Sequence, residues 1–157
     1  MTSLQWSKYK EENGPYNIYT ETETTVEFFD LDPFQVVWHG NYINYFEIGR
    51  RVLLEKIGYG YNEMTISGYA FPVVEVSAKY LAPLRHRDHA VIKAVLEEYE
   101  NRLMIRYEIR NAQTGILTTR GVTVQMAFDV KAGESCFVCP LALTEKVEKF
   151  ILDRDNN

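Results

Sequence analysis

The chain has 157 residues, of which 46% are hydrophobic and 25% are charged, so it is long enough for one domain with a sizeable buried core. Its formal net charge of -5 argues against a nucleic-acid-binding protein, because neutralising phosphates requires a dense basic surface. The sequence has neither an apolar leader nor a stretch long enough to span a membrane, which predicts a cytoplasmic protein without a membrane partner. Aromatic residues make up 13% of the chain and favour a ligand-binding or oligomeric protein.

The N-terminal region differs in composition from the rest of the chain. Residues 1–19 are polar and interrupted by Gly14-Pro15, which predicts an arm with little structure of its own. The folded domain is expected at residues 20–157. A first strand is predicted at residues 24–30, and Pro33 follows it closely.

A helical pattern extends from Asn41 to Ile57. Asn41 is the expected capping residue, and Gly58 stands where a left-handed C-terminal residue is needed. The polar side chains occupy one narrow sector of the helical wheel, whereas apolar side chains cover an arc of roughly 240°. We therefore expect other structure to surround this helix on most sides.

Strand patterns dominate the second half of the chain, after a glycine-punctuated loop. Four strands are predicted, at residues 71–83, 89–100, 102–111 and 116–130. Their short connections favour an antiparallel meander. A last helix at residues 143–153 is expected to be capped by Thr144. The predicted fold is α+β, an antiparallel sheet wrapped around one long central helix.

Cys136 and Cys139 form an isolated CxxC. A structural zinc site needs four ligands, and no second Cys or His pair stands at a suitable spacing. We interpret the two cysteines as small residues that lead into the last helix, with reduced thiols. Neither a metal nor another cofactor is expected.

The segment from Asp30 to Asn41 combines two carboxylates with the start of the long helix. The residue before a proline avoids the α region, so Asp32 is expected in an extended conformation. Unpaired amides near His39, Gly40 and Asn41 would lie at the positive end of the helix dipole and could stabilise an oxyanion. A carboxylate opposite them could attack a carbonyl or activate a water. An equally good reading from the residues alone is that both carboxylates only form turns.

These residues also carry a family resemblance. Asp-x-Asp-Pro, then Trp-His-x-Asn-Tyr, then a helix with Tyr-Phe-Glu resembles the hotdog-fold acyl-CoA thioesterases, in particular the branch named after 4-hydroxybenzoyl-CoA thioesterase. The resemblance covers roughly residues 20–152 and implies that Asp32 is the catalytic carboxylate, while Asp30 is structural. The chain departs from the family at Phe34 and Gln35, where small residues or glycine are frequent.

The resemblance also suggests roles for the neighbouring residues. His39 and Gly40 are expected to contribute to catalysis, mainly through backbone N–H groups, and Trp38, Asn41 and Tyr42 to contact the substrate. A metal site formed by Asp30, Asp32 and His39 is disfavoured, because their spacing matches no recognised ligand pattern. Asn41 has helix capping as its alternative role.

Charged residues outside this segment are further candidates. Glu47 is expected either to pair with Arg50 and Arg51 on the helix surface or to reach the site. Arg85 and Arg87 lie in a basic loop of an otherwise acidic protein. They are expected either to bind the phosphates of coenzyme A or to form a solvated turn.

The leading hypothesis is an acyl-CoA thioesterase, with an aliphatic or aromatic acyl group carried by CoA or by acyl-carrier protein. A hotdog hydroxyacyl dehydratase is disfavoured because Trp-His-Gly-Asn-Tyr replaces the His-Phe-Pro-Gly of that branch. A non-catalytic acyl-CoA-binding module remains an alternative. A serine hydrolase is disfavoured, because the sequence contains no G-x-S-x-G motif. The resemblance further implies a homo-oligomer, a dimer or a homotetramer, with active sites at subunit interfaces.

Overall fold

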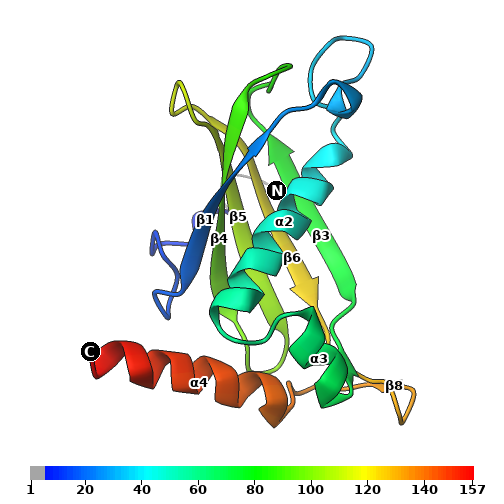
Figure 1. The fold of residues 1–157 in the computed structure, drawn as a ribbon, viewed down its shortest axis with the longest axis vertical. Coiled ribbons are helices and arrows are strands. Elements are labelled where there is room, and N and C mark those ends of the chain that lie inside the picture. The colour runs from blue at the N-terminus through cyan, green and yellow to red at the C-terminus, as the bar shows by residue number, and fades with distance from the viewer. Residues whose placement is uncertain (1–5) are drawn as a thin grey trace.

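A five-stranded antiparallel sheet packed against a long helix forms the body of the protein in this computed structural model, which describes residues 6–157. Helix α2 (Asn41–Lys56) lies across one face of the sheet (Figure 1). The strand order is β1-β4-β5-β6-β3. The strands are β1 (Tyr19–Thr25), β3 (Val73–Tyr80), β4 (His89–Glu98), β5 (Leu103–Asn111) and β6 (Leu117–Gln125). The α+β architecture with one long helix on an antiparallel sheet is confirmed.

The first strand lies earlier than the sequence predicted. Residues 19–25 pair with β4, from Tyr19 opposite Val95 to Thr25 opposite His89. Phe28–Asp30, predicted as strand, is a 3-10 helix, η1. The Glu27 N–H donates to the Asp30 carboxylate at 2.9 Å and closes this turn, so the prediction of a strand at residues 24–30 was wrong.

The predicted meander holds only for β4, β5 and β6. Strand β3 pairs with β6 and lies at the far edge of the sheet, because β1 occupies the second edge of β4. The alternation within β5 is confirmed: Tyr107 faces the helix and stacks on Phe46, whereas Arg106 faces the opposite side of the sheet.

Helix α2 is held against the sheet by an aromatic stack over a glycine. The rings of Phe46 and Tyr107 lie 4.6 Å apart and nearly parallel. A Cβ atom at Gly121 would come within 2.2 Å of the Phe46 ring, so only glycine allows this close approach. Surrounding structure covers the helix less completely than predicted. Ile43 is 44% exposed, so this side of α2 stays open, although Tyr42 at the helix start contacts Tyr80 of β3.

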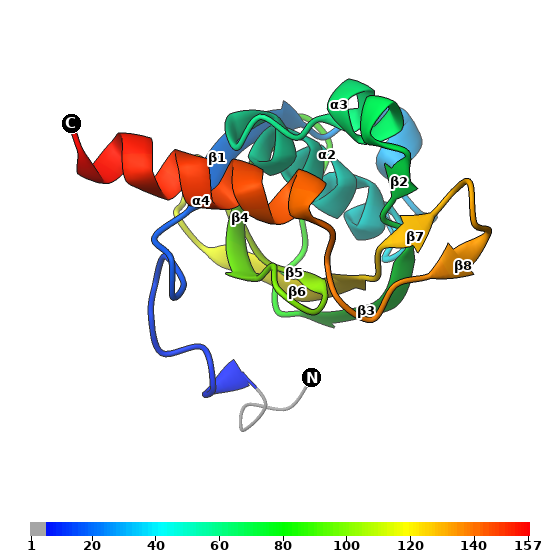
Figure 2. The ribbon, with the colours of Figure 1, turned by 90° about the horizontal axis from the view of Figure 1, so that it is seen from below.

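Two further helices complete the fold. Helix α3 (Tyr61–Ser67) occupies the predicted glycine loop, where Gly60 precedes it and Gly68 ends it in the left-handed conformation. Helix α4 (Leu141–Asp155) starts after Pro140 and crosses one end of the sheet (Figure 2). Thr144 lies inside α4 and does not cap it, contrary to our prediction. No helix within residues 6–157 is long and apolar enough to cross a membrane.

Three short strands form a second sheet beside α3, in the order β2-β7-β8. They are β2 (Tyr69–Ala70), β7 (Phe128–Asp129) and β8 (Glu134–Ser135). The two cysteines follow β8. Cys139 is buried, and burial raises the pKa of its thiol to about 11, which keeps this thiol protonated near neutral pH.

The described part of the N-terminal arm covers the outer face of the sheet. Trp6 and Tyr9 pack against a small cluster formed by Met104, Val122 and Val124. Arg106 is only 3% exposed; it pairs with Glu97 at 2.7 Å and donates to the carbonyls of Glu11 and Glu12. The arm is built largely of turns, yet these contacts attach it to the domain.

The Phe46–Gly121 contact yields the first prediction. Gly121→Ala should lower the free energy of unfolding by about 1–3 kcal/mol, because the added methyl group overpacks the core against the Phe46 ring. Urea denaturation measures the change. Combining it with Phe46→Leu should cost less than the sum of the two single changes. A Gly121→Ala variant as stable as the wild type would contradict this account.

Candidate active site

The Asp32 loop connects η1 to α2 and is pinned by backbone hydrogen bonds. The Asp32 N–H donates to the Val36 carbonyl and the Gln35 N–H to the Asp32 carbonyl, both at 2.9 Å. Isolated bridges join Leu31 to Val37 and Val36 to Arg85. The loop is therefore attached to the turn that follows β3, and Asp32 has a defined place.

The two oxygens of the Asp32 carboxylate differ in their contacts. Oδ1 accepts the N–H of Phe34 at 2.8 Å and, more weakly, the N–H of Val36 at 3.5 Å. Oδ2 accepts no hydrogen bond from residues 6–157. One oxygen thus forms the local turn, as the alternative reading proposed, while the other remains available for chemistry.

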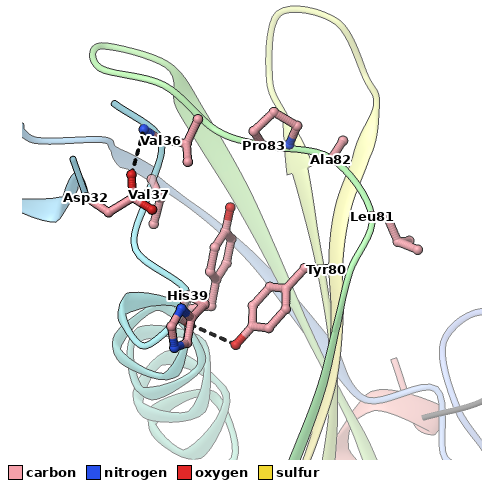
Figure 3. Close-up of a pocket in the computed structure, with 9 residues that line it drawn as sticks. Asp32, Val36, Val37, His39, Tyr80, Leu81, Ala82 and Pro83 are labelled. Atoms are coloured by element: carbon pink, nitrogen blue, oxygen red, sulfur yellow. Dashed lines mark hydrogen bonds between the residues drawn. The ribbon is translucent and has the colours of Figure 1, made fainter. Parts of the chain in front are cut away.

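A cavity of about 380 Å³ lies between this loop, the start of α2 and the end of β3 (Figure 3). Asp32 and Tyr80 stand on opposite sides of it, with His39 at the helix start (Figure 3). The lining residues come from these three segments: Asp32, Val36, Val37, His39, Tyr42, Tyr80, Leu81, Ala82 and Pro83. The structure therefore brings Asp32, His39 and Tyr42 together.

The start of α2 presents free backbone amides. Gly40 is the N-cap, and the Trp38 ring covers it so closely that a Cβ atom there would come within 2.3 Å of the ring. The Asn41 N–H donates to the Trp38 carbonyl at 2.9 Å. In the described part of the chain, the N–H groups of His39 and Gly40 have no acceptor. Of the three amides expected to be free at this helix start, that of Asn41 is paired, and those of His39 and Gly40 remain candidates for an oxyanion contact.

Tyr80 determines how the first peptide of this turn is oriented. Its hydroxyl donates to the His39 carbonyl at 2.8 Å, and its ring lies 5.2 Å from that of Tyr42. The sequence analysis did not identify Tyr80, nor the Leu81-Ala82-Pro83 wall. The only local signal for Tyr80 was its place at the end of a predicted strand, before Pro83. The pairing of β3 with β6 places Tyr80 at the site.

Asp30 connects the loop to the helix. Its carboxylate accepts the N–H of Glu27 and, at 3.0 Å, the hydroxyl of Tyr45. Its carbonyl accepts the Trp38 N–H and the side-chain amide of Asn41, at 2.9 and 2.8 Å. We predicted that Asn41 caps the helix, and this is wrong: its side chain instead attaches the helix start to the Asp30 carbonyl. Burial, together with the Asp30 carboxylate, raises the pKa of Tyr45, so its hydroxyl stays a donor.

Glu47 lies away from this cavity. It pairs with Arg50 at 2.8 Å and accepts the Tyr61 hydroxyl at 3.1 Å. Arg51 pairs with Glu55 at 3.1 Å and not with Glu47, whose carboxylate is engaged by Arg50 and the Tyr61 hydroxyl. Trp38 is likewise outside the cavity lining and acts on the site through Gly40.

Arg85 and Arg87 are exposed in the turn between β3 and β4. The Arg85 N–H donates to the Asp88 carboxylate at 2.8 Å, which forms the turn. Within residues 6–157, neither guanidinium forms an ion pair or a hydrogen bond. In the same part of the chain, no three His, Cys, Asp or Glu side chains converge as metal ligands.

Two curated relatives resemble parts of the chain. YneP of Bacillus subtilis (strain 168), named as a candidate acyl-CoA thioesterase, is 28% identical over 111 residues, which cover 70% of this chain and 80% of YneP. The chloroplastic acyl-acyl carrier protein thioesterase ATL3 of Arabidopsis thaliana is 41% identical over 76 residues. That match covers 48% of this chain and only 40% of ATL3.

Solved structures share the fold over most of their length. DHNA-CoA thioesterase from Staphylococcus aureus superposes with a TM-score of 0.75 at 25% identity, covering 88% of this chain and 95% of that one. A 4-hydroxybenzoyl CoA thioesterase complexed with 4-hydroxybenzoyl CoA gives a TM-score of 0.73 at 18% identity, covering 83% and 99%. At that identity the likeness concerns the fold.

A family model described as the Thioesterase-like superfamily matches residues 26–150, which include the Asp32 loop, α2 and every strand of the main sheet except β1. The resemblance read from residues 30–47 is thereby confirmed. The chain belongs to the Thioesterase-like superfamily and has its hotdog fold.

Proposed function

We propose that this protein is an acyl-CoA thioesterase that uses Asp32 to hydrolyse its substrate to the free acid and CoA. The observation that carries the proposal is the asymmetric Asp32 carboxylate. One oxygen is held by backbone amides and the other is free, at a cavity bordered by unpaired helix-start amides. Membership of a thioesterase family and the acyl-CoA thioesterase named among its relatives support this reaction.

The first step requires an electrophilic thioester carbonyl beside Asp32. Its oxygen accepts a helix-start N–H, and negative charge develops on that oxygen as the carbonyl carbon is attacked. Either Asp32 Oδ2 attacks, giving a mixed anhydride while the CoA thiolate leaves, or Asp32 takes a proton from the water that attacks. In the first route water then hydrolyses the anhydride and regenerates Asp32.

Peptide geometry distinguishes the two candidate amides. A trans peptide directs its C=O and N–H in opposite directions. The His39 carbonyl faces Tyr80, so the Gly40 N–H points away from that wall of the cavity. The Trp38 carbonyl faces Asn41, so the His39 N–H points back from the helix. Because His39 lines the cavity and Gly40 does not, we assign the oxyanion contact to the His39 N–H first, with Gly40 allowing the turn beneath Trp38.

The remaining predicted site residues take supporting roles. Tyr42 forms an apolar wall near the reacting carbonyl, and Asn41 holds the loop through Asp30. Glu47 lies on the open side of α2 with Tyr61, where a longer acyl group would pass. Arg85 and Arg87 carry positive charge that no residue from 6 to 157 neutralises by an ion pair, and they suit the phosphates of CoA.

The two edges of the sheet support a homo-oligomer. Strand β1 exposes Glu21 and Glu23, charges of the kind that prevent strands from pairing. Strand β3 exposes mainly apolar side chains beside Glu75; Val74 is 55% exposed and Val76 is 42% exposed. We infer that β3 pairs with β3 of a second copy, which would also cover the open side of α2.

Asp32→Asn tests the catalytic assignment. It keeps the shape and the Oδ1 hydrogen bonds but removes the charge, so kcat for acyl-CoA should fall by about 10²–10⁴ while acyl-CoA still binds. Asp30→Asn serves as the control: it should reduce stability by about 1 kcal/mol and leave most of kcat. Near-wild-type turnover in Asp32→Asn, together with an inactive Glu47→Gln, would transfer the catalytic role to the helix.

Light scattering at micromolar concentration tests the assembly. The wild type should be a dimer or a tetramer, and Val74→Lys should shift it toward monomer because a charge would enter the β3 edge. Glu21→Lys, on the opposite edge, should leave the mass unchanged. A wild-type protein that is strictly monomeric would refute pairing through β3.

A further inference from the structure

A second cavity, of about 540 Å³, lies on the other side of the Asp32 loop. Two loops enclose it, the one around Pro33 and the one around His86. Its lining residues are Phe28, Leu31, Asp32, Pro33, Phe34, Gln35, Arg85 and His86. Asp32 lines both cavities, so they are separated only by the loop that carries it.

Aromatic side chains at this second cavity are unusually exposed. Phe28 is 76% exposed and Phe34 is 87% exposed, although large apolar rings are normally removed from water. The His86 ring lies 5.9 Å from that of Phe28, in an edge-to-face arrangement. Exposed rings around a cavity suit a flat heterocycle, which stacks on aromatic faces.

Two arginines stand at one side of this cavity, opposite the Asp32 carboxylate that also lines it. Arg85 lines it, and Arg87 follows on the same turn. The guanidinium groups of both are without a partner among the described residues, in a protein whose net charge is -5. Arginine presents several N–H donors in a plane and binds phosphate oxygens in pairs.

Both loops also contain an uncommon backbone conformation. Among residues 6–157, only three residues other than glycine have positive φ, and two of them are Gln35 at 62° and Arg87 at 70°. Such conformations persist where surrounding contacts impose them, and they concentrate at ligand sites. Here the Gln35 N–H donates to the Asp32 carbonyl and the Arg87 N–H to the Val26 carbonyl.

We propose that this second cavity binds the adenosine 3′-phosphate 5′-diphosphate end of CoA. The adenine stacks between Phe28 and Phe34, beside His86, and the phosphates contact Arg85 and Arg87. The inference rests on the proposed function and specifies the carrier of the acyl group. The pantetheine arm would then pass the Asp32 loop to bring the thioester into the first cavity.

The occupant that this chemistry selects is a nucleotide and not a carrier protein. An acyl-carrier protein presents pantetheine without adenine, so it would use the arginines but leave Phe28 and Phe34 exposed. A purine nucleotide uses both features at once. The site therefore favours acyl-CoA over acyl-carrier protein as the substrate.

Adenosine 3′,5′-bisphosphate is the probe, because it carries the nucleotide without a thioester. Isothermal titration calorimetry should show binding to the wild type, and Phe34→Ala should weaken it roughly fivefold or more. Phe137→Ala is the matched control: Phe137 is 80% exposed but lies outside both cavities, so this variant should bind like the wild type.

Kinetics provide the second measurement. Phe34→Ala should raise KM for an acyl-CoA at least fivefold, yet leave kcat/KM for the same acyl group on pantetheine unchanged. Equal losses on both substrates would mean that Phe34 only shapes the loop, and would overturn the proposal. So would absence of bisphosphate binding to the wild type. If neither substrate is hydrolysed while the bisphosphate binds, the proposed function fails and the nucleotide site stands.

Discussion

The stack of Phe46 on Tyr107 over Gly121 sets the position of the whole site. It fixes how far α2 lies from the sheet, and the position of α2 in turn places the N–H groups at its start. Tyr107, on which Phe46 stacks, is buried, and its hydroxyl lies 2.8 Å from the Thr123 hydroxyl. Burial raises the pKa of Tyr107, so its side chain stays neutral. Gly49, about one helical turn after Phe46, also allows a close approach of α2 to the sheet, because a Cβ atom there would come within 2.9 Å of the Ile92 side chain. Small residues at contact points bring the helix close enough to be rigid.

Asp30 and Asp32 are two residues apart, but their carboxylates have different hydrogen-bond partners and therefore different roles in the loop. Asp30 accepts hydrogen bonds from Glu27 and Tyr45 on its side chain, so it joins the loop to α2. Asp32 has one oxygen engaged and one that accepts no hydrogen bond from the described residues. A carboxylate held through one oxygen keeps its direction without losing its reactive atom. The first aspartate thus positions the helix start relative to the second.

Other parts of the chain cover some of the apolar surface of the sheet and leave some of it exposed. The N-terminal arm covers Met104, Val122 and Val124 on the outer face, and α4 covers one end of the sheet. Apolar side chains then remain exposed at the β3 edge and at the Phe28–Phe34 tip. Both places adjoin the Asp32 loop or α2. Exposed apolar side chains therefore occur where substrate and a second copy are proposed to bind, although others, such as Ile66 and Phe137, lie elsewhere on the surface.

Local patterns determined much of this protein. The period of residues 41–57 predicted α2, the alternation in residues 103–110 predicted the faces of β5, and Asp-x-Asp-Pro with Trp-His-x-Asn-Tyr predicted the family. These features depend on neighbours within a few positions, so a sequence shows them directly. The position of β3 was decided only by the tertiary structure, because β1 and β3 both could pair with β4 and local periodicity does not rank them. That choice brings Tyr80 to His39 and closes the first cavity. The sequence therefore pointed to the carboxylate that we propose as catalytic, and long-range strand pairing formed the wall of the cavity that faces it.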